Sequence, residues 1–176
     1  MKKEKGPVLW FTGLSQSGKT TTANAVYNKL KEKGFSAERL DGDVVRNHKT
    51  TDLGFSPKDR NKNIEIASSL AKNISEKGII IVASFITPYK EQREMIREKL
   101  DNYIEIFCKC SLDVCEKRDT KGLYKKARNG EIDNFTGISD RYDIPDNADI
   151  VLNTNGEKVE DNISTIFQYL EENKII

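Results

Sequence analysis

Eight residues near the amino terminus have the types and spacing of a phosphate-binding loop. Gly13-Leu-Ser-Gln-Ser-Gly-Lys-Thr20 fits the pattern G-x-x-x-x-G-K-[ST]. Glycines allow such a loop to surround a phosphate with backbone N–H groups, and the positive end of the following helix faces the same anion. Lys19 would add a charge for the β- and γ-phosphates, and Thr20 would offer its hydroxyl to Mg²⁺. The ATP site is therefore expected to comprise Gly13, Leu14, Ser15, Gln16, Ser17, Gly18, Lys19, Thr20 and Thr21.

Two carboxylates follow the second apolar segment, in Leu40-Asp-Gly-Asp43. In open α/β sheets, ligands bind in the crevice at the carboxyl ends of the strands, where Asp41 would lie. Either Asp41 or Asp43 could order the waters of a bound metal or accept a proton from an attacking hydroxyl. An Asp-Gly turn with solvated carboxylates is the alternative, and the phosphate loop makes it less favoured. From these residues alone, either Asp41 or Asp43 could be the catalytic carboxylate and the Mg²⁺ partner.

Basic and aromatic side chains beyond these acids suggest a site for a second anionic molecule. Arg46, Arg60 and Asn63 surround Gly54-Phe-Ser56, and Arg60 and Asn63 share one helix face. Arginine suits bidentate capture of a phosphate or sulfate. A solvated helix surface is the alternative, but Phe55 in a polar loop could provide a platform for a nucleobase.

The polar stretch from about 119 to 147 is expected to be a lid. It is long for a loop in a compact domain, and Gly122, Gly130 and Gly137 could serve as hinges. From Glu116 to Glu131 basic residues outnumber acidic ones, a balance that suits closure over phosphates, although a basic surface helix would explain it too. The basic residues are Lys117, Arg118, Lys121, Lys125, Lys126 and Arg128, and the acidic ones are Glu116, Asp119 and Glu131.

The order of elements predicts what must position these residues. Apolar runs typical of strands alternate with segments typical of helices, and the phosphate loop falls between the first strand and the first helix. This order predicts an α/β protein with the three-layer P-loop NTPase fold: a mostly parallel central sheet, helices on both faces and a basic lid, in one domain over residues 1–176. Strands are expected at 8–12, 35–40, 79–85, 103–108 and 150–152, and helices at 19–33, 57–77, 89–100, 112–118 and 159–173.

Composition narrows the classes of function. Lys+Arg is 29 and Asp+Glu is 28 in 176 residues, a balance that disfavours a nucleic-acid coat or a protein of anionic membranes. The longest apolar run, 79–85, is far shorter than the about 20 residues of a membrane span. The three cysteines and the absence of a signal peptide predict a reduced, cytoplasmic protein. Cys108 and Cys110 are expected to share a buried strand face rather than to bind metal.

Taken together, these residues resemble the adenylylsulfate kinase family. The loop 13–20 alone would be generic, but the other segments are specific when they occur in this order. The similar segments are Leu40-Asp-Gly-Asp-Val-Val-Arg46, Asp52-Leu-Gly-Phe-Ser56 with Asp59-Arg-Asn-Lys-Asn63, Ser84-Phe-Ile-Thr-Pro-Tyr89, Lys121-Gly-Leu-Tyr-Lys-Lys-Ala-Arg128 and Phe135-Thr-Gly-Ile138.

The resemblance implies ATP-dependent phosphorylation of the 3′-hydroxyl of adenosine 5′-phosphosulfate. It implies that Asp41 lies by the acceptor hydroxyl and the metal, and that Phe55 and Phe135 hold the acceptor's adenine between them. Lys121 would reach from the lid toward both nucleotides, and Arg118 would lie near the ATP base. The phosphosulfate would be held by Arg46, Arg60 and Asn63, near the backbone of Ile86. A homodimer is also implied.

Two departures from the family pattern bear on the acceptor. Thr87 stands where many members have a serine described as a phosphorylated intermediate, and we expect direct transfer instead. Val44 stands where many members of the family have an asparagine near the acceptor. A kinase for another nucleotide, such as cytidine diphosphoramidate, is therefore the first alternative, and a non-catalytic ATP-binding sensor is the second. Guanine-recognition motifs N-K-x-D and T-K-x-D are absent, which disfavours a GTPase.

Overall fold

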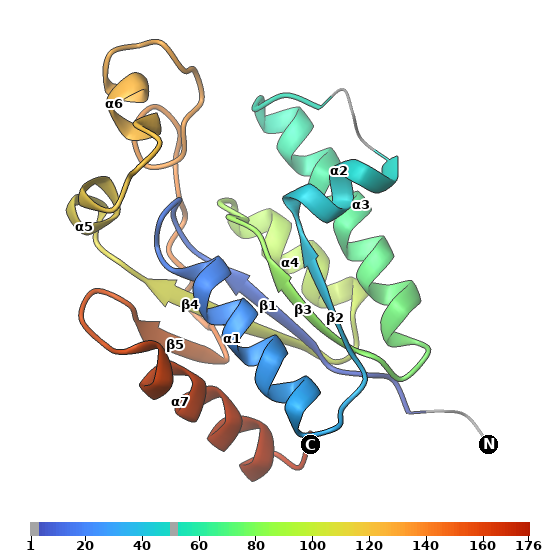
Figure 1. Ribbon diagram of the computed structural model, residues 1–176. Helices are drawn as coiled ribbons and strands as arrows, with labels where there is room; N and C mark the ends of the chain where they lie inside the picture. Colours follow the sequence, from blue (N-terminus) through green and yellow to red (C-terminus); the bar gives the residue numbers. More distant parts are fainter. Residues whose placement is uncertain (1–3, 50–52) are drawn as a thin grey trace.

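The computed structural model describes residues 4–49 and 53–176, and the side chains of 46–49 lie outside that description. Its described part contains a five-stranded parallel sheet in the order β2-β3-β1-β4-β5 (Figure 1). The strands alternate with helices along the chain, as the sequence predicts. The strands are β1 (Val8–Thr12), β2 (Ala37–Asp41), β3 (Ile80–Ser84), β4 (Tyr103–Lys109) and β5 (Ile150–Asn153).

Helices cover both faces of the sheet and complete three layers. On one face α1 packs beside α7, and on the other α3 packs beside α4 (Figure 1). Beyond the carboxyl ends of the strands, α5 and α6 lie on one side and α2 on the other. The helices are α1 (Lys19–Glu32), α2 (Gly42–Lys49), α3 (Pro57–Ser75), α4 (Lys90–Lys99), α5 (Leu112–Lys117), α6 (Leu123–Arg128) and α7 (Val159–Glu172).

Strand β1 lies in the middle of the sheet and divides the core into two parts. Its side chains point alternately to the two faces, so Leu9 and Phe11 pack with the α1 and α7 side. Val8 and Trp10 pack with the α3 and α4 side. Because both faces are covered, the strand is apolar at consecutive positions rather than at alternate ones. This burial fixes the strand whose carboxyl end begins the phosphate loop.

Local signals place the start of α3 and the end of α1 where the sequence predicts them. The Ser56 hydroxyl oxygen accepts the Asp59 N–H at 3.1 Å, and Pro57 occupies the first turn of the helix. Gly34, just after α1, has φ 86°, a left-handed conformation that glycine adopts at little cost. The start of α3 matters for the site because Arg60 and Asn63 follow within two turns.

Two short helices and one cysteine differ from the sequence expectations. Helix α2 was not expected, and it begins where the Asp41 carboxylate accepts the N–H groups of Asp43 and Val44, both at 3.0 Å. Helix α6 lies inside the expected lid, where a basic helix was the alternative interpretation. The expectation of a buried face shared with Cys108 is wrong for Cys110, which follows the end of β4 and is half-buried. In the described part of the chain, no helix combines the length and the apolar character needed to cross a membrane.

Candidate functional site

The segment Gly13–Thr20 forms a tight loop between β1 and α1. A Cβ at Gly13 would lie 2.9 Å from the carbonyl oxygen of Cys108, so only glycine allows this approach to β4. Gly18, at the start of α1, has φ 89°. The first N–H groups of α1 lack carbonyl partners within the helix, and with the helix dipole they favour an anion at this end. The loop therefore has the geometry of an anion cradle.

Lys19 lies buried at this cradle. Its ammonium donates to the carbonyl of Leu14 at 2.5 Å and to the Ser17 hydroxyl at 3.4 Å, and both partners are uncharged. Burial is the main cause that lowers the pKa of Lys19, to about 8. Burial also raises the pKa of the neighbouring Cys108 thiol to about 12, so this thiol is neutral and adds no counter-charge near pH 7. A bound phosphate would supply the negative charge that Lys19 lacks.

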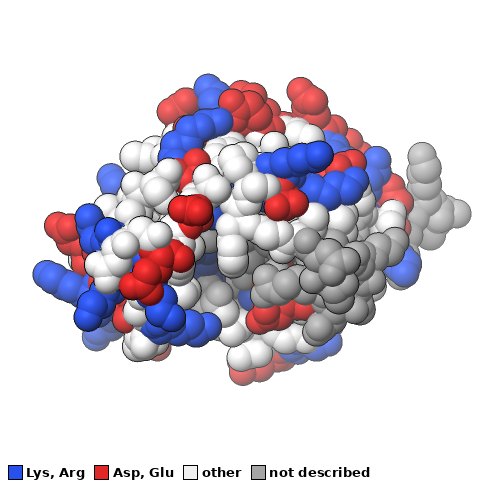
Figure 2. All heavy atoms as spheres, turned by 90° about the horizontal axis from the view of Figure 1, so that it is seen from above, with Lys and Arg blue, Asp and Glu red and all other residues white. Residues whose placement is uncertain are grey.

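One cavity of about 840 Å³ joins this cradle to the ends of β2 and β3. Figure 2 looks onto this end of the molecule and shows a hollow near the middle of the face, with acidic and basic side chains around it. The volume lies within the range of about 300–1,000 Å³ typical of ligand pockets. Residues singled out from the sequence that line the cavity are Ser15, Gln16, Gly18, Lys19, Thr20, Thr21, Asp41, Asp43, Phe55, Arg60, Asn63, Ile86 and Thr87.

The Asp41 carboxylate is held from two directions. One oxygen caps α2, and the other lies 3.7 Å from the Arg39 guanidinium. Arg39 also donates to the Ser84 hydroxyl at 2.9 Å, so it joins the ends of β2 and β3. Sequence reasoning missed Arg39, although its place two residues before Asp41 puts both side chains on the same side of β2. This arrangement fixes the carboxylate at the cavity wall.

Arg60 connects the start of α3 with the segment 119–147, which the sequence predicts to be a lid and which keeps that name below. Its guanidinium donates to the carbonyls of Phe55 at 2.9 Å and Asn134 at 2.6 Å, and it lies 4.0 Å from the Asp140 carboxylate. The Phe55 ring lies 6.0 Å from the guanidinium and is 68% exposed. Asp140 also accepts a hydrogen bond from the Tyr89 hydroxyl. Burial, with this bond, raises the pKa of Tyr89 to about 12.

Other expected site residues lie outside the lining of this cavity. Arg118 donates to the carbonyl of Thr154 at 2.6 Å, and Thr154 adjoins Gly18 on the outer side of the phosphate loop. Lys121 is exposed between α5 and α6. Phe135 packs edge-on against Tyr124 at 4.9 Å. The side chain of Arg46 lies outside the described residues, and Gly13, Leu14 and Ser17 belong to the phosphate loop but not to the cavity lining.

Tyr124 and Thr87 show how the lid and the cavity floor are attached. The Tyr124 hydroxyl donates to the carbonyl of Ser15 at 2.7 Å and so ties α6 to the phosphate loop. The Thr87 hydroxyl accepts the Trp10 indole N–H at 2.9 Å and donates to the Phe85 carbonyl at 3.3 Å. Both hydrogen-bonding roles of this buried hydroxyl are therefore used within the protein. Sequence reasoning gave Tyr124 no role of its own.

The donor set suits Mg²⁺. The Thr20 hydroxyl and the carboxylates of Asp41 and Asp43 line one cavity, and Mg²⁺ prefers such oxygen ligands. Within residues 4–49 and 53–176, no cluster of three or more His, Cys, Asp or Glu has the arrangement of a metal site. Mg²⁺ in kinases is held by one or two carboxylates together with substrate phosphates, so it needs no such cluster.

Comparison with known proteins places this geometry in context. Residues 5–153 match the family described as adenylylsulphate kinase. The chain is 52% identical over 172 residues to the adenylyl-sulfate kinase of Halothermothrix orenii, covering 98% of this chain and 93% of that one. It is similar to the Mycobacterium tuberculosis APS kinase solved in complex with AMPPNP and APS, with a TM-score of 0.90 and 40% identity over 95% of this chain and 98% of that one. It is also similar to a hexameric APS kinase from Thiobacillus denitrificans (TM-score 0.75, 25% identity), covering 99% of this chain and 30% of that one.

The burial of Lys19 predicts an unusual pH dependence of stability in the nucleotide-free protein. Below pH 8 folding must bury a charged ammonium, whereas the unfolded chain exposes it. Lys19→Met should therefore raise the free energy of unfolding at pH 7 by about 2 kcal/mol, since a pKa unit corresponds to about 1.4 kcal/mol and the lost hydrogen bonds offset part of the gain. The difference in free energy of unfolding between Lys19→Met and the wild type should shrink from pH 8 to pH 10.5, because Lys19 loses its proton in the folded wild type over this range.

Urea unfolding of the wild type and Lys19→Met at several pH values measures this difference. Lys31→Met is the matched control, because Lys31 lies exposed on the same helix. An advantage of Lys19→Met that is absent at pH 7, or equal at all pH values, would contradict the burial of a charged Lys19.

Proposed function

The chain belongs to the adenylylsulfate kinase family, and we propose that it transfers the γ-phosphoryl group of ATP to the 3′-hydroxyl of adenosine 5′-phosphosulfate. The observation that carries this proposal is the single cavity in which the phosphate cradle, the Asp41 carboxylate and Arg60 meet. Its volume has room for the reacting ends of a donor and an acceptor. The complex of the Mycobacterium tuberculosis relative with AMPPNP and APS supports the same pair of substrates.

On the donor side, the proposed ATP residues are those of the phosphate loop from Gly13 to Thr20, with Thr21. Backbone N–H groups bind the β- and γ-phosphates, and Lys19 neutralises charge that develops during transfer. Arg118 would meet the nucleotide from the outer side of the loop, through its position at Thr154. Thr20 and Asp41 would hold Mg²⁺ together with the phosphates, and the ion would supply positive charge against the transferred group.

On the acceptor side, Asp41 orients the 3′-hydroxyl and accepts its proton as the new P–O bond forms. Phosphoryl transfer depends mainly on positioning and on stabilising charge, so a carboxylate fixed by α2 and Arg39 suits this role. Arg60 and Asn63 bind the phosphosulfate, and Phe55 packs against the base. Arg46, Lys121 and Phe135 complete the proposed acceptor set through the lid and α2.

Assembly and location remain predictions. A homodimer is our expectation, and the hexameric relative from Thiobacillus denitrificans is consistent with assembly of several copies. The expected cytoplasmic location rests on the sequence alone.

The direct test of the proposal is ADP release from ATP and Mg²⁺ across a panel of acceptors. We expect release with adenosine 5′-phosphosulfate, formation of 3′-phosphoadenosine 5′-phosphosulfate, and loss of turnover when Mg²⁺ is chelated. Faster release with cytidine diphosphoramidate would favour the alternative kinase. Tight ATP binding without acceptor-dependent ADP release would instead indicate a sensor.

Asp41→Asn should lower kcat by about 10²- to 10⁴-fold while the affinity for ATP changes little. Asparagine caps helices as well as aspartate does, so α2 should remain folded and only the negative charge is lost. Steady-state kinetics and equilibrium ATP binding measure the two effects.

Asp43→Asn is the comparison that distinguishes the two carboxylates. A larger loss of kcat in Asp43→Asn would transfer the catalytic role to Asp43. An equal loss of kcat and of ATP affinity in Asp41→Asn would leave Asp41 with a metal-binding or structural role.

Arg60→Ala should raise the KM for the acceptor by about ten- to a hundredfold, because a hydrogen bond to a charged group contributes about 1.5–3 kcal/mol. The KM for ATP should change little. Lys62→Ala is the matched control: Lys62 lies on the same helix but pairs with Glu65, outside the cavity lining. An unchanged acceptor KM in Arg60→Ala would remove Arg60 from the acceptor site.

A further inference from the structure

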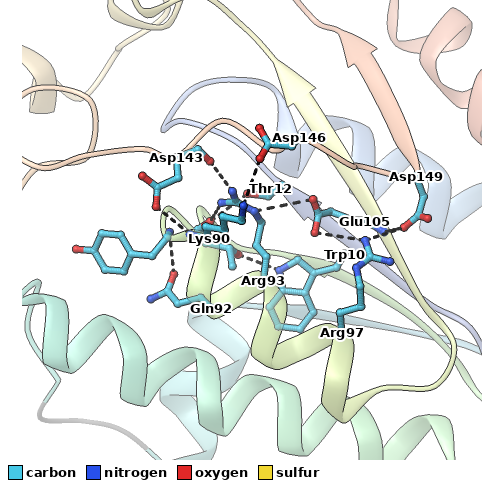
Figure 3. A network of polar contacts seen from close by, with 12 residues as sticks. Trp10, Thr12, Lys90, Gln92, Arg93, Arg97, Glu105, Asp143, Asp146 and Asp149 are labelled. Atoms are coloured by element: carbon cyan, nitrogen blue, oxygen red, sulfur yellow. Dashed lines mark hydrogen bonds and ion pairs between the residues drawn. The ribbon is translucent and has the colours of Figure 1, made fainter.

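A buried arginine behind the acceptor side of the cavity belongs to none of the motifs that the sequence singled out. Arg93 lies on α4 and is 4% exposed. Figure 3 shows its guanidinium between Glu105 of β4 and Asp143 at the carboxyl end of the lid. Burying a guanidinium is costly unless its donors are satisfied, so its partners indicate what it stabilises.

The guanidinium of Arg93 bridges two backbone segments. It donates to the carbonyl of Thr87 at 2.9 Å and to the carbonyl of Asp143 at 2.5 Å. Thr87 belongs to the turn 86–88, which lines the cavity and follows β3. Asp143 is joined to the same turn, because its N–H donates to the carbonyl of Pro88 at 2.8 Å. One side chain therefore connects the floor of the acceptor site with the end of the lid.

A second set of contacts supports the same turn from β1. Thr12 donates to the carbonyl of Ile86 at 2.6 Å and lies 3.0 Å from the Tyr142 hydroxyl. The Arg93 guanidinium stands 5.9 Å from the Tyr142 ring. Thr87 itself has φ 48°, a conformation that is unfavourable for a β-branched residue and persists only when its surroundings impose it.

The positive charge of Arg93 is balanced by Glu105, which is not part of the cavity lining. Glu105, 4% exposed, lies 3.9 Å from the guanidinium and accepts a hydrogen bond from the Tyr103 hydroxyl at 3.0 Å. Arg97, one turn further along α4, lies 3.7 Å from the same carboxylate and 3.2 Å from that of Asp149. Arg97 thus shares the counter-ion of Arg93, but its ion pairs and hydrogen bond go to Glu105 and Asp149 rather than to the turn 86–88 or the lid. Comparing substitutions of Arg93 and Arg97 therefore distinguishes a role in balancing the charge of Glu105 from a role in positioning the turn 86–88 and the lid.

We propose that Arg93 is a positioning residue for the acceptor: it fixes the turn 86–88 and the end of the lid in one arrangement, so that the backbone at Ile86 and the lid residues meet the same substrate. This inference rests on the proposed function. Arg93 would not touch either nucleotide. Lysine at this position would keep the charge beside Glu105, but it is a point charge without the planar fork that reaches both carbonyls.

Arg93→Lys should raise the KM for adenosine 5′-phosphosulfate about tenfold or more, with a change of less than about threefold in the KM for ATP, because an ammonium does not reach the carbonyls of both Thr87 and Asp143 as the guanidinium does. Arg97→Lys is the matched control and should leave both KM values near those of the wild type. Thermal unfolding of both variants shows whether each is folded at the assay temperature.

Trp10 gives a second readout that does not depend on turnover. It is the single tryptophan of the chain, and its indole N–H donates to the Thr87 hydroxyl. Arg93→Lys should shift the emission spectrum of Trp10 in the folded protein, whereas Arg97→Lys should not. Tyr142→Phe removes the hydroxyl beside Thr12 and should raise the acceptor KM by a few fold. If Arg93→Lys does not fold, this variant tests the same connection between the turn 86–88 and the end of the lid.

Three results would overturn the inference. An acceptor KM in folded Arg93→Lys within twofold of the wild type is one. The second is a parallel loss in Arg93→Lys and Arg97→Lys, which would assign Arg93 to stability alone. The third is an unchanged acceptor KM in Tyr142→Phe if Arg93→Lys is unfolded. If the wild type itself releases no ADP with adenosine 5′-phosphosulfate, the proposed function fails, and Trp10 emission still tests the connection between the turn 86–88 and the end of the lid.

Discussion

The site depends on a positive charge that the protein buries before any anion has arrived. Lys19 lies in the cradle with uncharged partners, and its lowered pKa reflects the cost of removing its ammonium from water. Around it the glycines of the loop and the start of α1 direct N–H groups at the same place. The cradle therefore favours phosphate binding at the expense of the stability of the nucleotide-free protein. A bound anion offsets the unfavourable free energy of burying the Lys19 ammonium.

The parallel sheet turns this local arrangement into a two-substrate site. All five strands run in the same direction, so the phosphate loop, Asp41 and the turn 86–88 leave the ends of the adjacent strands β1, β2 and β3 at one edge. Because β1 is buried between the two parts of the core, the position of the phosphate loop at its carboxyl end is fixed relative to the sheet. Arg39 then joins the ends of β2 and β3, and Arg93 joins the turn 86–88 to the end of the lid. Precision at the site comes from these connections as much as from the motifs.

Much of the fold and of the cavity lining follows from local sequence. Periodicity gave the strand and helix order, and the loop motif with Asp41, Arg60 and Asn63 gave residues that line one cavity. Helix α2 escaped prediction because its start depends on a carboxylate cap rather than on an apolar pattern. Arg93 and Tyr124 escaped prediction because their partners are backbone carbonyls, of Thr87 and Asp143 for Arg93 and of Ser15 for Tyr124. Every residue has a backbone carbonyl, so no residue type in the sequence indicates such a partner.

The contacts of Arg60 affect which anions the site would retain. Its guanidinium already binds the carbonyls of Phe55 and Asn134, so a newcomer must share or replace partners that are in place. A small ion such as free sulfate exchanges one contact for another and gains little net free energy. A nucleotide brings, besides its anionic group, a flat base for the exposed Phe55 ring. If Arg60 and Phe55 have the proposed acceptor roles, selectivity for a whole nucleotide over its detached oxyanion would arise from competition with the protein's own backbone, without a residue that rejects the smaller ion.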